Sequence, residues 1–149
     1  MAKRFQFRLE PLLKLRSHKV EQAKEALHFV MAMRIAKDEM IEMQKDYLKE
    51  LTAKKMESSS VAEIQAHWHH KVYIEEDIKK LIVERNQILE IESLKRDDLA
   101  LVMKDEKIIL KLKDKKLIAH KKEVLKEETQ AFDETAQIQY IRALKSVNA

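Results

Sequence analysis

The chain has 149 residues, enough for one domain, and it contains no glycine, no cysteine and one proline. Glycine is usually needed in tight β-hairpin turns and in phosphate-binding loops, so its absence argues against all-β and α/β folds and against P-loop or Rossmann nucleotide sites. Charged residues make up 38% and hydrophobic residues 45% of the chain. This mixture is typical of long helices that carry narrow apolar stripes.

The net charge is +4, with 30 basic and 26 acidic residues interspersed along the chain. Mixed charge favours solvated helix surfaces over a nucleic-acid site, so nucleic acid is not an expected partner. Attraction to an acidic partner or a membrane surface stays open. The lack of cysteine is typical of a cytosolic protein. No apolar run approaches the ~20 residues that span a bilayer, and the opening Met1-Ala2-Lys3-Arg4-Phe5 leads into no apolar stretch, so no signal peptide is expected.

The first helix is predicted over about residues 8–56, beginning between Phe7 and Glu10, because Pro11 suits a first helical turn. One row of residues recurs every seven positions: Leu13, Val20, Leu27, Arg34, Ile41 and Leu48. A second row has the offset of a coiled-coil seam: Ala23, Val30 and Leu51. An adjacent row predicts a broader seam: Ala26, Met33, Met40 and Tyr47.

The connection between helices is predicted over about residues 58–70, as a turn or a short helix. Serine favours helix starts, and three serines stand at positions 58–60. Ser60 and Glu63 have the spacing of a capping box, in which each side chain bonds the other residue's backbone amide. A helix is therefore expected to begin at Val61.

The second helix is predicted over about residues 71–143. It contains the longest row of apolar residues at heptad spacing, and only Arg96 interrupts that row. Its members are Ile82, Leu89, Arg96, Met103, Leu110, Leu117, Val124, Ala131 and Ile138. The complementary row is poor: Ile78, Arg85, Glu92 and Leu99. Flanking residues could widen the contact: Leu81, Ile88, Val102, Ile109, Ile118 and Leu125.

Together these patterns predict an all-α fold: a long antiparallel two-helix coiled coil, or helical hairpin, forming one elongated domain over residues 1–149. Reflecting the chain about position 65 aligns both rows, with Leu27 level with Met103 and Arg34 level with Arg96. Facing arginines call for nearby carboxylates, for which Asp38, Glu92 and Asp97 are candidates. The match could also arise by chance, and a parallel dimer is not excluded. In this register residues after about 130 form a projecting C-terminal helix end.

No residue pattern indicates catalysis, so neither an enzyme, a cofactor nor a small-molecule substrate is expected. His67 and His70 could share a helix face with Glu63 as metal ligands, but a stable zinc site needs three or four good ligands. Surface histidines are therefore the favoured interpretation. Trp68 either fills the turn or anchors a partner. Met40 and Met43 suit an adaptable surface, although methionine at helical spacing more often fills a core.

The N-terminal stretch is distinctive in its order of apolar residues: Phe7, Leu9, Leu12, Leu13 and Arg16. Towards the C-terminus a basic stretch is followed by acidic residues: Lys121, Lys122, Glu123, Glu127, Glu128, Asp133 and Glu134. In both motifs, in length and in lack of glycine, the chain resembles the FliJ family, the small coiled-coil component of the bacterial flagellar type III export apparatus. The related stalk proteins of injectisomes share this architecture. The chain departs from the family in having no arginine soon after Glu134, since the next one is Arg142.

The resemblance implies a non-enzymatic stalk and regulator that binds the hexameric export ATPase, the export gate membrane protein and export chaperones. It implies a cytoplasmic location, peripheral at the inner membrane beneath the flagellar basal body. The residues implied in ATPase binding are Phe7, Leu9, Leu12, Leu13, Arg16, Glu127, Asp133, Glu134 and Arg142. Those left for the gate or chaperones are Met40, Met43, Tyr47 and Trp68. The alternative is a structural coiled-coil spacer or adaptor unrelated to an ATPase.

Overall fold

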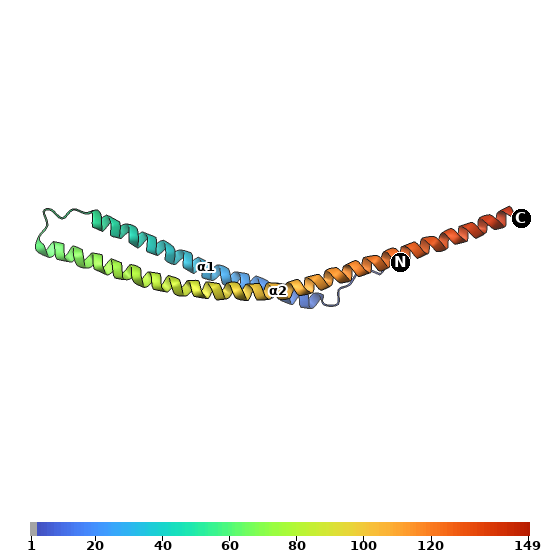
Figure 1. Ribbon diagram of the computed structural model, residues 1–149, viewed down its shortest axis with the longest axis horizontal. Helices are drawn as coiled ribbons and strands as arrows, with labels where there is room; N and C mark the ends of the chain where they lie inside the picture. The colour runs from blue at the N-terminus through green and yellow to red at the C-terminus, as the bar shows by residue number, and fades with distance from the viewer. Residues whose placement is uncertain (1–2) are drawn as a thin grey trace. The chain divides into compact units, whose positions relative to one another are not determined.

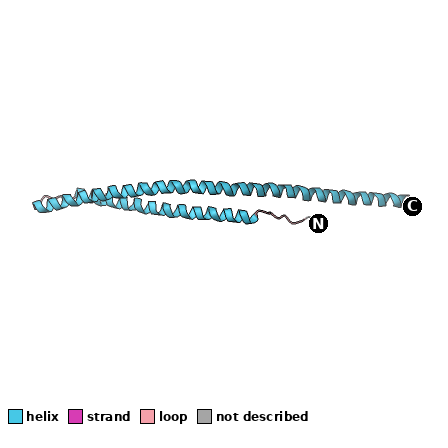
Figure 2. Cartoon of the chain, turned by 90° about the horizontal axis from the view of Figure 1, so that it is seen from below, coloured by secondary structure: helices cyan, strands magenta, loops and turns pink. Residues whose placement is uncertain are grey.

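The computed structural model describes residues 3–149, and over this range the chain forms two long helices and no strand. Helix α1 is Glu10–Ala53 and helix α2 is Val61–Val147, and residues 54–60 join them (Figures 1 and 2). Met1 and Ala2, which open the predicted N-terminal segment, lie outside the described residues. The predicted all-helical pair of long helices is confirmed.

The structure divides into two units. The hairpin unit is His18–Met103, and the terminal unit joins the described residues up to Ser17 with Lys104–Ala149. Both helices contribute to both units. Each unit has its own internal contacts.

Helix α1 begins where its proline predicts. Pro11 is the second helical residue and lies in the first turn. Backbone N–H groups there have no partner within the helix, so proline, which has no N–H, costs no hydrogen bond. The amide of Glu10 donates to the carbonyl of Phe7 over 3.2 Å, which forms the turn that leads into the helix. The Glu10 carboxylate also complements the positive end of the helix dipole.

The link between the helices is shorter than predicted, because the capping box starts α2 early. The amide of Glu63 donates to Ser60 Oγ over 3.3 Å, and the amide of Ser60 donates to Glu63 Oε2 over 3.1 Å. The predicted start at Val61 is therefore confirmed. The turn predicted over residues 58–70 is wrong, since Trp68 and its neighbouring histidines lie inside α2.

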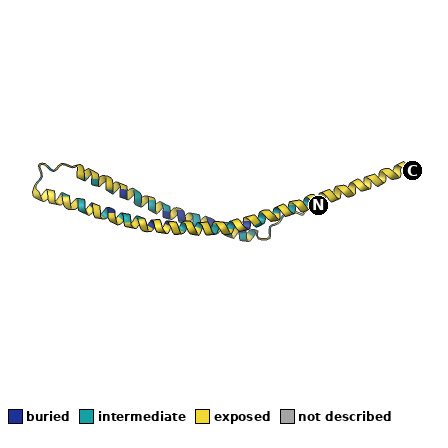
Figure 3. Cartoon of the chain, viewed as in Figure 1, coloured by how far each residue is buried: buried dark blue, intermediate teal, exposed yellow. Residues whose placement is uncertain are grey.

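Within the hairpin unit the two helices run antiparallel on either side of the link (Figure 1). The predicted seam of α1 is confirmed by burial of Val20, Leu27, Val30 and Ile41. The broader seam is wrong, because the adjacent row is exposed at every member but Ala26, with Met40 at 50% and Tyr47 at 43%. One narrow stripe of α1 therefore faces α2 (Figure 3).

The face that α2 turns to α1 differs by one residue from the predicted row. In the hairpin unit the buried residues of α2 are Ile74, Ile78, Ile88 and Glu92. The predicted row is largely outside, with Leu89 exposed by 41% and Met103 by 48%. The complementary row, which contains Arg85 and Glu92, is part of the observed seam. Both of these charged residues form ion pairs with residues of α1.

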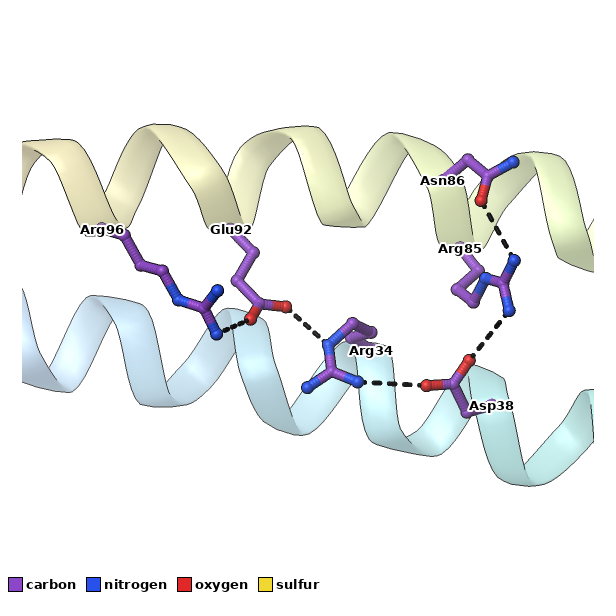
Figure 4. A network of polar contacts seen from close by, with 6 residues as sticks. All are labelled: Arg34, Asp38, Arg85, Asn86, Glu92 and Arg96. Atoms are coloured by element: carbon purple, nitrogen blue, oxygen red, sulfur yellow. Dashed lines mark hydrogen bonds and ion pairs between the residues drawn. The ribbon is translucent and has the colours of Figure 1, made fainter.

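A network of charged residues explains how Glu92 tolerates burial (Figure 4). Glu92 is 2% exposed, and each of its carboxylate oxygens accepts a bond of 2.6 Å, one from Arg34 Nε and one from Arg96. Arg34 also contacts Asp38 at 3.1 Å, and Asp38 contacts Arg85 at 3.5 Å. The hydrogen bond to Glu92 is the main cause that raises the pKa of Arg34 above its ordinary value. Arginine is charged throughout the usual pH range in any case, so the stabilisation from this raised pKa is fully present there and is lost only above the ordinary pKa of a guanidinium.

The register follows this network and corrects the predicted one. Arg34 pairs with Glu92, and Lys37 pairs with Glu84 over 2.5 Å, so the pairing of Arg34 with Arg96 is wrong. The expected carboxylates Asp38 and Glu92 are nevertheless present. The shorter link moves α2 relative to the predicted alignment, and the exposure of Met103 removes it as the partner of Leu27.

The α2 face can be tested with neighbouring residues. We expect Ile88→Ala to lower the free energy of unfolding by roughly 2–4 kcal/mol, because it opens a cavity in the seam. Leu89→Ala is the matched control, and its partly exposed side chain should cost less than about 1 kcal/mol. Urea denaturation followed by circular dichroism measures both, and a larger loss for Leu89→Ala would restore the predicted row.

The network can be tested by removing its centre. We expect Glu92→Ala to lower the free energy of unfolding by about 1.5–3 kcal/mol, because both arginines lose a short hydrogen bond to a charged acceptor. Glu90→Ala, at an exposed position on the same helix, should change it by less than about 0.5 kcal/mol. The double variant Arg34→Leu with Glu92→Leu should recover much of the loss. Equal unfolding midpoints for Glu92→Ala and Glu90→Ala would contradict this role.

Candidate partner-binding surfaces

The N-terminal segment, residues 3–9, lies against α2 in the terminal unit without being helical itself. The Phe5 ring is 5.5 Å from the His120 ring, and Lys113 Nζ lies 6.0 Å from the centre of the Phe7 ring. The second contact has the distance of a cation–π interaction. A hollow of about 740 Å³ lies between the segment and α2. The side chains of Phe5 and Phe7 thus anchor this non-helical segment to α2.

The first turns of α1 attach to the same part of α2 by polar contacts. Glu10 pairs with Lys113 over 2.9 Å, and Arg16 donates to the carbonyl of Asp105 over 2.8 Å. Leu13 is only 6% exposed, so it belongs to the core of the terminal unit. Leu13 and Arg16, both predicted to bind a partner, therefore have structural contacts of their own.

The other predicted ATPase-binding residues are more accessible. Leu9 is 36% exposed and Leu12 is half-buried. Glu127, Asp133, Glu134 and Arg142 are exposed, as is every described residue from 125 to 149 (Figure 3). Of these four, Glu127 lines a hollow together with Lys3 of the N-terminal segment.

The terminal unit gathers basic residues that are far apart in the sequence. Residues 3–17 and 104–126 together contain fourteen lysines and arginines and five aspartates and glutamates. The count over the whole chain hides this excess, because acidic residues predominate elsewhere. Sequence reasoning missed the surface, although charge counted separately over the two segments would have indicated it.

A second surface lies near the link, within the hairpin unit. Met40, Met43 and Trp68 are 50%, 71% and 61% exposed, so these methionines do not fill the core and the indole does not fill the turn. Tyr47 Oη and His70 Nε2 are 3.0 Å apart and connect α1 to α2. The structure therefore exposes two thioethers and an indole in this region, and a hydrogen bond to His70 holds the tyrosine.

Between residues 3 and 149 no three histidine, cysteine or acidic side chains are grouped so that they could hold a metal ion. Over the same range no helix is long and apolar enough to cross a membrane.

Comparison with known proteins gives one match. The family model described as "Flagellar FliJ protein" matches residues 5–145, which include most of the N-terminal segment, all of α1 and nearly all of α2. No curated protein and no solved structure matches the chain. The match covers far more than half of the sequence and includes the motifs at both of its ends, so the chain belongs to the family of flagellar FliJ proteins.

Proposed function

We propose that this chain is a stalk and regulator that binds the hexameric ATPase of the flagellar export apparatus. Its family makes it a non-enzymatic component of that apparatus. The observation that carries the proposal is the terminal unit, in which the N-terminal family motif lies against the second half of α2. The N-terminal segment thus shares hollows with Glu123 and Glu127, the beginning of the acidic part of the C-terminal motif.

The residues proposed to touch the ATPase fall into two groups. Phe7, Leu9 and Leu12 offer apolar contacts beside an excess of basic charge, which favours an acidic surface on the ring. Glu127, Asp133, Glu134 and Arg142 are accessible on the exposed end of α2. Leu13 and Arg16 act by holding α1 on α2, so they position the surface.

The surface near the link is proposed for the export gate or for export chaperones. Exposed methionine adapts to different partners, and tryptophan often contributes much of the binding energy at an interface.

The heptad spacing of the buried rows also supports coiled-coil packing with a left-handed twist. A stalk of this kind would act in the cytoplasm, at the inner membrane beneath the basal body.

The ATPase assignment is tested by adding the purified chain to the cognate export ATPase and measuring ATP turnover and hexamer formation. We expect the chain to increase both. Phe7→Ala should weaken binding at least tenfold through the loss of an apolar contact, whereas Phe29→Ala, at a 69% exposed site of the hairpin unit, should not. Absence of binding and of any change in turnover would favour a spacer or adaptor.

The acidic residues are tested by reversing charge in pairs. Asp133→Lys with Glu134→Lys should raise the dissociation constant for the ATPase, because the contacts lose their sign complementarity. Glu75→Lys with Glu76→Lys is the control, an exposed acidic pair on the same helix but in the hairpin unit. Equal effects of the two pairs in a titration would contradict a specific role for Asp133 and Glu134.

A further inference from the structure

The last turns of α2 carry large apolar side chains that are exposed to solvent. The four most exposed, Leu125, Phe132, Tyr140 and Val147, are 64%, 74%, 65% and 80% exposed, while Ile138, Ile141 and Leu144, on other faces of the helix, are 51%, 51% and 45% exposed. All four belong to the terminal unit. Removing apolar side chains of this size from water is favourable, so a surface that covered them would gain binding free energy. Isolated apolar residues need no explanation, but an ordered stripe of them does.

These residues form one stripe along the helix. With the small residues between them they are Leu125, Thr129, Phe132, Ala136, Tyr140, Ala143 and Val147. Successive spacings are four, three, four, four, three and four, which is a repeat of eleven residues over three turns. At about 3.67 residues per turn, this repeat stays on one face of an almost straight helix.

The stripe is symmetric about Ala136. Leu125 and Val147 are equally far from it, and so are Phe132 and Tyr140, while Thr129 and Ala143 form a third, smaller pair. A helix that meets a second copy of itself in antiparallel orientation places such positions opposite each other. We propose that a second copy of this chain covers the stripe, as an antiparallel dimer of C-terminal helix ends with its two-fold axis at Ala136.

Residue size suits this arrangement. Alanine at the axis lets the two helices approach closely, and on each side a Phe132 ring meets a Tyr140 ring. Aromatic side chains bury about 150–250 Å² each, so the four rings would supply on the order of 600–1,000 Å². A stable interface needs roughly 1,200–2,000 Å², and the aliphatic pairs contribute further area.

Charge also favours the antiparallel pairing. Glu128 and Arg142 lie on the same edge of the stripe, fourteen residues apart and nearly symmetric about Ala136. Glu128 of one copy then comes within about two residues, or ~3 Å along the axis, of Arg142 of the other. Two such ion pairs would border the interface. A parallel pair would instead place Glu128 and Arg142 fourteen residues, or about 21 Å, apart along the axis, so that this ion pair could not form.

The proposal does not depend on the proposed function, because it concerns the purified chain alone. It adds a consequence to that function. Arg142 cannot serve the dimer and the ATPase at once, so self-association would compete with binding to the ring. A dimer could thus keep this end of the chain covered until its partner is present.

Single cysteines test the orientation, since the chain has none of its own. Under mild oxidation Ala136→Cys should form a disulfide-linked dimer. Thr129→Cys and Ala143→Cys should not do so alone, because each lies about 20 Å from its own copy, but a mixture of the two should cross-link. Glu127→Cys, on the opposite face of α2, is the control. Cross-linking of Thr129→Cys with itself, or none with Ala136→Cys, would overturn the antiparallel dimer.

Sedimentation of the intact chain tests the interface without cysteines. Phe132→Glu should weaken dimerisation at least tenfold, and Phe29→Glu, an exposed phenylalanine in the hairpin unit, should not. Glu128→Arg and Arg142→Glu should each weaken the dimer, and the double swap should restore it. Circular dichroism checks that all variants remain helical. A monomeric wild-type chain, or equal dissociation constants for the two phenylalanine variants, would refute the proposal.

Discussion

The burial of one carboxylate constrains the pairing of the two helices. Glu92 is 2% exposed, which its two arginine partners make tolerable by donating to both of its oxygens. Since Arg34 comes from α1, this bond fixes which residues of the two helices lie side by side. It also fixes the face of α2 that turns inward. The more continuous apolar row, with Leu89 and Met103, is left outside as a result.

Sequence reasoning succeeded where the signal is local and failed where it depends on contacts between distant residues. Pro11 and the Ser60–Glu63 capping box marked both helix starts, and the sevenfold row through Val20 and Ile41 marked the seam of α1. On α2 apolar continuity indicated the wrong face. In the sequence Glu92 interrupts an apolar row and so argues against burial of that face. Its partners are Arg34, 58 residues away, and Arg96, on the next turn of α2.

The two candidate surfaces differ in how much the sequence revealed. The exposed Met43 and Trp68 were identified by residue type alone, although only the structure shows that neither is buried. The basic surface of the terminal unit combines two segments that are nearly a hundred residues apart in the sequence. A net charge summed over consecutive residues therefore does not reveal it. Of the N-terminal family residues, Leu13, Arg16 and Phe7 have contacts within the chain, whereas Leu9 is more exposed and free to bind. The partners themselves remain our proposal.

The link at residues 54–60 has a consequence for the order in which the chain folds. Tyr47 and His70 are 23 residues apart, Arg34 and Glu92 are 58 apart, and Arg16 and Asp105 are 89 apart. Closing a longer loop costs more entropy, so pairing should begin beside the link and proceed towards the termini. The aromatic anchors Phe5 and Phe7 would join last and detach first, as the part of the chain with the lowest local stability. The N-terminal segment can therefore peel from α2 while the hairpin unit stays intact, which would give amide hydrogens there the fastest exchange in the paired regions.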